Sequence, residues 1–361
     1  MYTKKPTHCH IELTTKCNAA CPLCPRTTFL ENTNNQLPTK EIDLEFFKRI
    51  YSMKGFEEIR HWEFCGNYGD PIFANHLIDI ASYIRNVSNH KITIRTNASI
   101  HPPKWWENLA KLNCDVIFAI DGIKDTHEFY RRNTSYDTVI ENAKAYINAG
   151  GAATWQFIPF LHSEHEQNDC IKLAKDLGFT SFITRVSNRF ITPKGVNIKS
   201  RIIIEKNGEK TSISEPNAFN NGEHCITTED EYFQSLLNSP VDCRACKDGL
   251  VYISSQGYLF PCCYLGHIYF KGVDDLYSKE LMLMLKQNKL SISILDLRIN
   301  EADEILNHPV YKMNIPNSWK DNSHLNPLRT CKRVCGIEKH RFAPQTYNQK
   351  IDFNESSNSH I

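Results

Sequence analysis

Residues 8–187 alternate between short apolar runs and longer stretches that carry apolar residues at helical spacing. Apolar runs of this length predict buried strands, and the amphipathic stretches between them predict helices. The predicted strands are 8–14, 57–65, 91–96, 114–120, 153–160 and 180–187. The predicted helices are 42–53, 75–87, 104–112, 136–149 and 166–177. Strands that alternate with helices predict an α/β fold with one parallel sheet and right-handed crossovers.

This alternation stops after residue 187. Residues 201–210 predict a hairpin that turns at Asn207 and Gly208, and polar sequence follows it. We therefore expect 188–240 to be a linker or insertion that leads away from the sheet. A strand at 250–254 and helices at 274–288 and 296–307 are predicted next, with Trp319 and His324 in a polar loop. The polar residues from 348 onward are expected to be disordered.

Composition narrows the class of protein. With 361 residues the chain forms one large domain or two smaller ones. It has 42 basic and 41 acidic residues, and this balance argues against a nucleic-acid partner. We expect no membrane span, because no apolar run approaches the ~20 residues that one needs. The N-terminus lacks the apolar core of a signal peptide, so its fourteen cysteines predict a reducing cytoplasm and metal binding.

Three cysteines follow the first predicted strand at C-x3-C-x2-C spacing: Cys17, Cys21 and Cys24. Thiolates are the ligands of iron–sulfur clusters, and cysteines this close together can converge on one centre. Three ligands leave one iron of a four-iron cluster open, which suits catalysis better than a structural role. Zinc, disulfides and a chance run are the alternatives. Zinc sites usually show paired C-x2-C knuckles with four ligands, so the spacing favours a cluster.

This loop, directly after the first strand, resembles the cluster loop of the radical S-adenosylmethionine (SAM) enzymes. In that family SAM chelates the open iron, and its reductive cleavage gives a 5'-deoxyadenosyl radical that abstracts a hydrogen atom from substrate. The resemblance implies a partial (β/α)6 TIM-like barrel with its chemistry at the C-terminal ends of the strands. It also implies a [4Fe-4S] cluster, SAM and a reducing electron donor of the flavodoxin or ferredoxin type.

Motifs at the following strand ends extend the resemblance. Residues 68–71 resemble the family's Gly-Gly-Glu-Pro, whose backbone contacts the methionyl amino group, although an ordinary Gly/Pro turn also fits. Residues 96–98 resemble its Thr-Asn-Gly, and 119–122 its Ser-Leu-Asp-Gly, in which Asp121 would bind the ribose. Arg131 would grip the SAM carboxylate, with Arg132 or a solvated surface role as alternatives. The SAM contacts that the resemblance implies are Gly66, Tyr68, Gly69, Asp70, Asn97, Asp121 and Arg131.

Several other residues lie near these strand ends without a motif. Cys65 is expected to be a buried structural thiol, although a functional one is possible. His162 and His165 are too few for a metal site and fit an ordinary polar loop. Either Arg185 or Arg189 can face the site. Of the adjacent Trp105 and Trp106, one is expected to pack on the barrel, because neighbours in a helix do not share a face.

A second set of cysteines lies in the C-terminal part of the chain. It comprises Cys243, Cys246, Cys262, Cys331 and Cys335. The spacing from Gly257 to Cys262 resembles the auxiliary-cluster domains called SPASM and Twitch, and the short set fits Twitch, with one auxiliary [4Fe-4S] cluster. Either Cys243 or Cys246 is then spare. A zinc ribbon from Cys243, Cys246, Cys331 and Cys335 is the alternative, and Cys225 has no near partner in the sequence.

These predictions divide the chain into a radical SAM core at 1–187, a linker at 188–240, an auxiliary iron–sulfur domain at 241–340 and a tail at 341–361. The expected function is a net oxidation of a small, sugar- or cyclitol-like molecule, assisted by the auxiliary cluster. One alternative is a radical SAM enzyme that modifies a peptide or protein. The other is a zinc or iron–sulfur binding module without catalysis.

Overall fold

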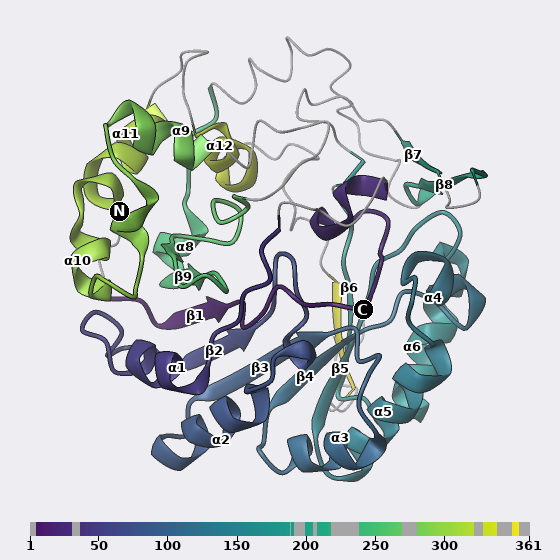
Figure 1. The fold of residues 1–361 in the computed structure, drawn as a ribbon. Coiled ribbons are helices and arrows are strands. Elements are labelled where there is room, and N and C mark those ends of the chain that lie inside the picture. Colours follow the sequence, from purple (N-terminus) through teal and green to yellow (C-terminus); the bar gives the residue numbers. More distant parts are fainter. Residues whose placement is uncertain are drawn as a thin grey trace, which may run out of the picture.

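The computed structural model describes residues 5–30, 37–187, 189–190, 199–204, 208–217, 238–268, 280–320, 328–337 and 349–353. Its centre is a sheet of nine strands in the order β10-β9-β1-β2-β3-β4-β5-β6-β11. Six consecutive parallel strands form its middle: β1 (His8–Ile11), β2 (His61–Phe64), β3 (Lys91–Thr96), β4 (Asp115–Ala119), β5 (Ala152–Phe157) and β6 (Ser181–Thr184). Helices line the outer side of this sheet (Figure 1). The predicted partial barrel is confirmed.

Five helices connect these strands, and their predicted bounds are correct within two residues. They are α1 (Leu44–Tyr51), α2 (Leu77–Val87), α3 (Pro103–Ala110), α5 (Tyr136–Asn148) and α6 (Gln167–Asp176). The short α4 (Asp125–Tyr130) was not predicted as a helix. Most predicted strands were too long, because buried apolar residues such as Leu13 and Phe160 continue beyond the last ladder hydrogen bond.

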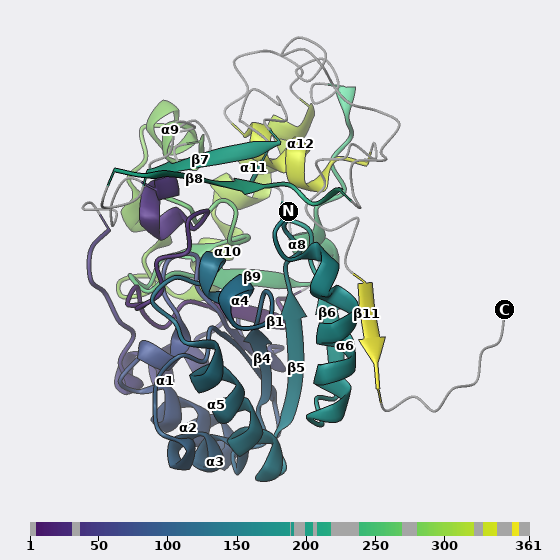
Figure 2. The same cartoon turned by 90° about the vertical axis from the view of Figure 1, so that its right-hand side faces the viewer.

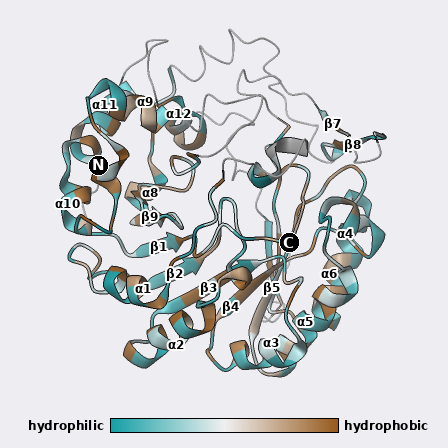
Figure 3. Ribbon diagram, in the orientation of Figure 1, coloured by the Kyte–Doolittle hydropathy of each residue, from teal (hydrophilic) through white to brown (hydrophobic). Residues whose placement is uncertain are grey.

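The core lies between the sheet and the outer helices. Phe118 of β4 and Trp155 of β5 are fully buried, and β4 is coloured as strongly hydrophobic along most of its length (Figure 3). Trp106 of α3 is buried as well, and its Nε1 donates to the Ile100 carbonyl at 3.1 Å. Its neighbour Trp105 is half-buried and stacks on His101. The two tryptophans therefore differ as expected, and Trp106 is the one that packs on the barrel.

The C-terminal part of the chain extends the same sheet. β9 (Leu250–Ile253) pairs parallel with β1, with His8 opposite Leu250, and β10 (Leu259–Phe260) returns antiparallel to β9. Short helices follow around it: α8 (Arg244–Lys247), α9 (Glu280–Gln287), α10 (Ala302–Asn307), α11 (Ile315–Lys320) and α12 (Arg329–Cys335). They lie beyond the β1 side of the barrel (Figure 1). Backbone pairing thus joins this part directly to the first strand of the barrel.

The predicted hairpin is confirmed, but its expected direction was wrong. β7 (Ser200–Ile204) and β8 (Lys210–Ser214) form a two-stranded antiparallel sheet. Ile203 and Ile213 are buried in one apolar cluster with Leu23 of the cysteine loop, and Leu161 N donates to Ser214 O at 3.1 Å. The hairpin therefore covers the cysteine loop instead of leading away from the barrel, because its apolar side needs a surface to bury against.

The tail was also predicted wrongly in part. β11 (Gln349–Asp352) pairs antiparallel with β6 and forms the edge of the sheet opposite β10 (Figure 2). Ile351 is half-buried against the core, so pairing with β6 orders a segment whose own sequence is mostly polar.

The C-terminal predictions need two further corrections. The helix expected at 296–307 begins only at Ala302, after a turn, and Trp319 lies on α11 instead of in a loop. Of the helix expected at 274–288, Glu280–Gln287 is observed and the rest lies outside the described residues, as do His324 and Cys225. No helix in the described ranges has the length and apolarity that crossing a membrane requires.

Candidate active site

The cysteine loop follows β1 and folds into tight turns. Cys24 N donates to Cys21 O at 3.0 Å, and the Thr27 hydroxyl lies 2.8 and 2.9 Å from the carbonyl oxygens of Cys21 and Cys24. The three cysteines pack in one apolar cluster with Leu23 and Tyr130. The loop is thus held by its own backbone, and its thiols lie in surroundings that contain little water.

Two N–H donors reach these sulfurs, one from the end of β3 and one from the end of α4. Asn97 Nδ2 lies 3.5 Å from Cys17 Sγ, and an Arg131 guanidinium nitrogen lies 4.0 Å from Cys21 Sγ. Burial raises the pKa of Cys21 to about 12, although Arg131 opposes this, and raises the pKa of Cys17 as well. Buried thiolates require compensating charge, which a metal centre and these N–H donors supply. The site therefore fits the iron–sulfur cluster that the spacing predicts.

The loop after β2 packs very closely on the cysteine loop. A Cβ on Gly69 would overlap the carbonyl oxygen of Thr14, and a Cβ on Gly66 would overlap the carbonyl oxygen of Gly69. Only glycine therefore fits at either position. Asp70 is buried next to them and accepts from Thr96 Oγ1 and from Asn97 N, both at 2.7 Å. Its carboxylate joins the ends of β2 and β3 beside Cys17.

Sequence reasoning missed Glu12, which joins three elements below this site. Its Oε1 accepts from Tyr68 N at 2.7 Å and Gly69 N at 2.9 Å, and its Oε2 accepts from Tyr252 Oη of β9 at 2.9 Å. Burial raises the pKa of Glu12, while these hydrogen bonds lower it. An acidic residue between Ile11 and Leu13 in an apolar run was the available signal.

Asp121 and Arg131 bind each other in the structure. Arg131 Nε donates to Asp121 Oδ2 at 2.6 Å, and Ile158 N donates to Asp121 Oδ1 at 2.7 Å. The Asp121 side chain is 0% exposed. Asp121 holds the guanidinium of Arg131 next to Cys21, and its expected ribose contact stays a prediction. Arg132 is half-exposed, and its Nε faces the Phe129 carbonyl.

A cavity of about 380 Å³, here the cluster-side cavity, opens at this loop. Cys21, Cys24 and Arg131 line it at one end, and Gln156 and Ile158 of the β5 end contribute further wall. The expected SAM contact Gly66 also lines it. Tyr68 does not, because its side chain is buried and packs edge-on against His267 at 5.8 Å.

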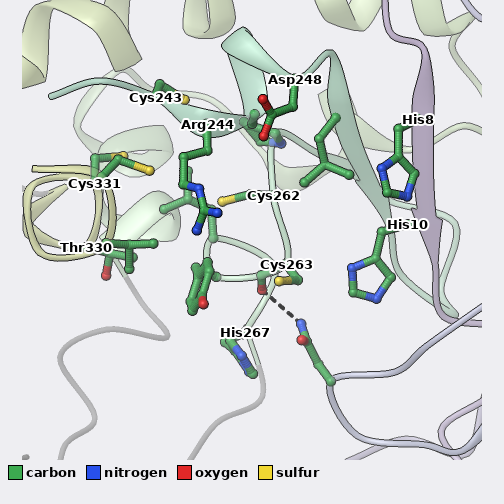
Figure 4. A pocket seen from close by; sticks show the side chains of 18 of the residues that line it. His8, His10, Cys243, Arg244, Asp248, Cys262, Cys263, His267, Thr330 and Cys331 are labelled. Carbon is green, nitrogen blue, oxygen red and sulfur yellow. Dashed lines mark hydrogen bonds between the residues drawn. The ribbon is translucent and has the colours of Figure 1, made fainter. Parts of the chain in front are cut away.

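A second cavity of about 420 Å³, here the auxiliary-side cavity, contains most of the second cysteine set (Figure 4). Cys243, Cys262, Cys331 and Cys335 line it, whereas Cys246 does not. Burial raises the pKa of Cys262 and that of Cys331. The pKa of Cys335 is raised by its contact with Cys243 and by burial. Cys243 at the start of α8, Cys262 after β10, and Cys331 and Cys335 of α12 thus line one space. This arrangement fits a four-iron cluster and favours Cys243 over Cys246.

The wall opposite these cysteines belongs to the barrel interior (Figure 4). His8 and His10 of β1 line it, with Glu63 and Arg95, which form an ion pair. His10 Nε2 lies 2.9 Å from the Cys65 carbonyl oxygen. Sequence reasoning missed these residues, although polar side chains at alternate positions of short apolar strands were the signal.

The remaining candidates are now placed. Cys65 is half-buried and lines the auxiliary-side cavity, where its thiol can contact a ligand. Arg185 and Arg189 both line both cavities. His162 stacks on Phe160, with ring centroids 5.5 Å apart. Within the described residues no three Cys, His, Asp or Glu side chains are arranged to hold a single metal ion. This applies to the pair His162 and His165 and to the cysteines of the alternative zinc ribbon. Cluster cysteines need not approach each other as closely, because irons and sulfides lie between them.

Comparison with known proteins agrees with this geometry. Residues 11–177 match the model of the radical SAM superfamily. The chain is 20% identical over 331 residues to the GTP 3',8-cyclase of Nautilia profundicola, which covers 89% of this chain and 94% of that protein.

Solved structures share the fold at low identity. The structure of anSMEcpe with bound AdoMet superposes with a TM-score of 0.54 at 16% identity, over 95% of this chain and 88% of that chain. Streptococcus suis SuiB bound to the precursor peptide SuiA gives a TM-score of 0.56 at 13% identity, over 92% and 72%. The present chain covers only 61% of the length of SuiB in the SuiB structure with bound S-adenosylmethionine. With its cysteine loop at the C-terminal end of β1 in a six-stranded partial barrel, the part of this chain from residue 11 to residue 177 is similar to the radical SAM superfamily.

Proposed function

We propose that this enzyme carries out a net oxidation of a small, polar, sugar- or cyclitol-like substrate. The observation that carries the proposal is that the two cavities are adjacent and share five lining residues. Both are lined by Gly66, Asn67, Arg185, Arg189 and Tyr264. A substrate at this junction would lie between the cysteines of the SAM cluster and those of an auxiliary [4Fe-4S] cluster.

When bound, SAM with its cluster would supply an acceptor for a hydrogen atom of the substrate and the auxiliary cluster would supply an acceptor for one electron, so that one proton would remain for a base of the chain. The chain's own residues bind and orient the substrate and hold that proton. His10 is our candidate base. Its Nε2–H donates to the Cys65 carbonyl, so in the neutral ring Nδ1 keeps its lone pair as an acceptor. Burial lowers the pKa of His10, which favours this neutral form at pH 7.

The barrel wall supports a substrate that is rich in hydrogen-bonding groups. Gln156 Oε1 accepts from Arg95 at 3.1 Å, and Asn67 Nδ2 donates to the Cys263 carbonyl at 2.9 Å. Asn67 lines both cavities and Gln156 lines the cluster-side cavity, where their remaining polar atoms can meet a ligand. A hydroxylated small molecule satisfies such groups better than an apolar one.

Peptide or protein modification is the second candidate function. The similarity to SuiB, solved with a precursor peptide, and to anSMEcpe, solved with the Cp18Cys peptide, favours it. We also propose a flavodoxin- or ferredoxin-type electron donor and a reducing cytoplasmic location, in line with fourteen cysteines.

Metal content and SAM cleavage test the proposal together. Iron and sulfide are measured after anaerobic reconstitution of the wild type and of the triple variant Cys17→Ala/Cys21→Ala/Cys24→Ala. SAM and dithionite are then added, and 5'-deoxyadenosine is quantified. We expect about 8 Fe in the wild type and about 4 in the triple variant, because one cluster remains on the second cysteine set. Only the wild type should form deoxyadenosine.

Two outcomes would contradict the proposal. Zinc in place of iron would make a binding module the better account. Intact SAM in a fully loaded wild type would do the same. Screening of small polyols against peptides, with deoxyadenosine formation above the substrate-free rate as readout, then separates the two candidate functions.

A further inference from the structure

Arg185 lies at the junction of the two cavities. It directly follows β6, and its backbone N–H donates to Phe157 O at 2.8 Å. Its half-buried side chain lines both cavities, and its buried Nε has no hydrogen-bond partner in the described part of the chain. A guanidinium held in this way offers its donors to whatever occupies the junction.

Three of the other arginines that line the cavities, Arg131, Arg95 and Arg244, have carboxylate or thiol neighbours of their own. Arg131 pairs with Asp121 and approaches Cys21, and Arg95 pairs with Glu63. Arg244 lies beside Cys335, where its charge lowers the pKa of that thiol against the raising effects of burial and Cys243. These arginines compensate either a carboxylate or the sulfurs of an expected cluster.

Arg185 differs from them. No ion pair joins Arg185 to a carboxylate among the described residues. The carboxylate whose charge acts on its pKa is Glu63, which already pairs with Arg95 and His8. Burial and the positive charge of Arg95 both lower the pKa of Arg185, so its charged form is short of compensation. A buried guanidinium without an anion is unfavourable, and a carboxylate or phosphate would relieve this.

We propose that Arg185 binds an acidic group of the substrate, a carboxylate or a phosphate ester, at the junction of the two cavities. This inference rests on the proposed function and narrows its substrate class to an anionic one. The planar fork of arginine matches both oxyanions with two parallel hydrogen bonds. The uncharged remainder of the substrate would then extend past Gln156 towards Cys21 and Cys24, along the wall of the cluster-side cavity.

Inorganic phosphate and acetate serve as probes of this site. Each is titrated by calorimetry, at low ionic strength, into the reconstituted, SAM-loaded enzyme. We expect saturable binding to the wild type and at least about tenfold weaker binding to Arg185→Gln, since two charge-assisted hydrogen bonds are lost. Arg185→Lys keeps the charge and should retain part of the affinity. Arg60→Gln removes an exposed arginine outside both cavities and should bind like the wild type.

The outcomes separate this inference from the proposed function. Tighter binding of phosphate indicates a phosphate ester, and tighter binding of acetate indicates a carboxylate. Absence of saturable binding, or equal binding by Arg185→Gln with full iron content, overturns the anion site even if SAM is cleaved normally. Absence of deoxyadenosine from the wild type overturns the proposed function whatever the anions do.

Discussion

At the scale of single residues, the burial of His10 determines how its protonation couples to stability. Its folded-state pKa lies below the ordinary value of about 6.5 because burial disfavours the charged ring. Glu63 raises this pKa, and Arg95 and His8 lower it. The unfolded chain therefore takes up a proton at a higher pH than the folded protein does. The contribution of the neutral, buried His10 ring to stability is therefore complete above pH 6.5 and is lost as the pH falls below that value.

This predicts a difference between the wild type and His10→Gln. Between pH 7.5 and 5.5 the free energy of unfolding of the wild type should fall more steeply, by up to about 1.4 kcal/mol per pH unit below 6.5. Gln keeps a donor for the Cys65 carbonyl but does not titrate. Anaerobic denaturant unfolding measures the difference, with His76→Gln, an exposed histidine paired with Asp79, as control. Parallel pH profiles of wild type and His10→Gln would show that His10 titrates normally.

Residue identities near the site were partly predictable from the sequence. Motif positions identified Gly66, Gly69, Asp70, Asn97 and the three cysteines, and the structure brings all of these together. The pairing of Asp121 with Arg131 could not be predicted, because it depends on how α4 places Arg131 across the end of β4. Glu12 has no motif, since its partners come from distant loops and strands.

At the scale of elements, the fit between the loops after β1 and β2 is very close. Replacing Gly69 by Ala should separate these loops, because the added Cβ would overlap the Thr14 carbonyl oxygen. We expect deoxyadenosine formation to fall by about 10²-fold, the effect of displacing a bound reactant by an ångström. The SAM cleavage assay with dithionite measures it at matched iron content.

Gly150→Ala provides the matched control. Gly150 has φ +88° with open space around its Cα, so Ala there costs about 1–2 kcal/mol of backbone strain far from the site. That variant should lose stability but keep SAM cleavage. Equal losses of cleavage in both variants would show that Gly69 acts through general stability and not through the loop contact.

Element prediction succeeded where the sequence carries its own periodicity. The outer helices α2 and α5 place their buried residues on one face, and their bounds followed from this pattern. β11 has largely exposed side chains, and its conformation comes from hydrogen bonds to β6, so its sequence contains no strand pattern. The packing of β7 and β8 over the cysteine loop likewise depends on apolar residues that are far away in the sequence.

At the scale of the whole molecule, the cavity walls distinguish the two neighbouring cysteines of the second set. Because Cys243 faces the auxiliary-side cavity and Cys246 does not, Cys246→Ala should retain about 8 Fe after reconstitution, whereas Cys243→Ala should approach about 4. Iron analysis with electron paramagnetic resonance of the reduced protein checks this. The reverse pattern would identify Cys246 as the ligand.

Spacing alone could not resolve that choice. Cys243 and Cys246 stand only three positions apart in the sequence, so their spacing to Cys262 favours neither. The turn of α8 directs one of them to the cavity. The sequence did indicate that the cysteines around β10 and on α12 converge, because both sets matched a known pattern. It gave no sign that β9 would join the barrel sheet.

The pairing of β9 with β1 has a consequence for biosynthesis. β1 leaves the ribosome long before β9, so one of its edges stays open until Leu250–Ile253 has been translated. Between the synthesis of β1 and that of β9 the nascent chain therefore exposes unpaired backbone next to the future cluster site, where another chain could pair with it. This side of the sheet, and with it a closed site for metal delivery, can be completed only after β9 has been made.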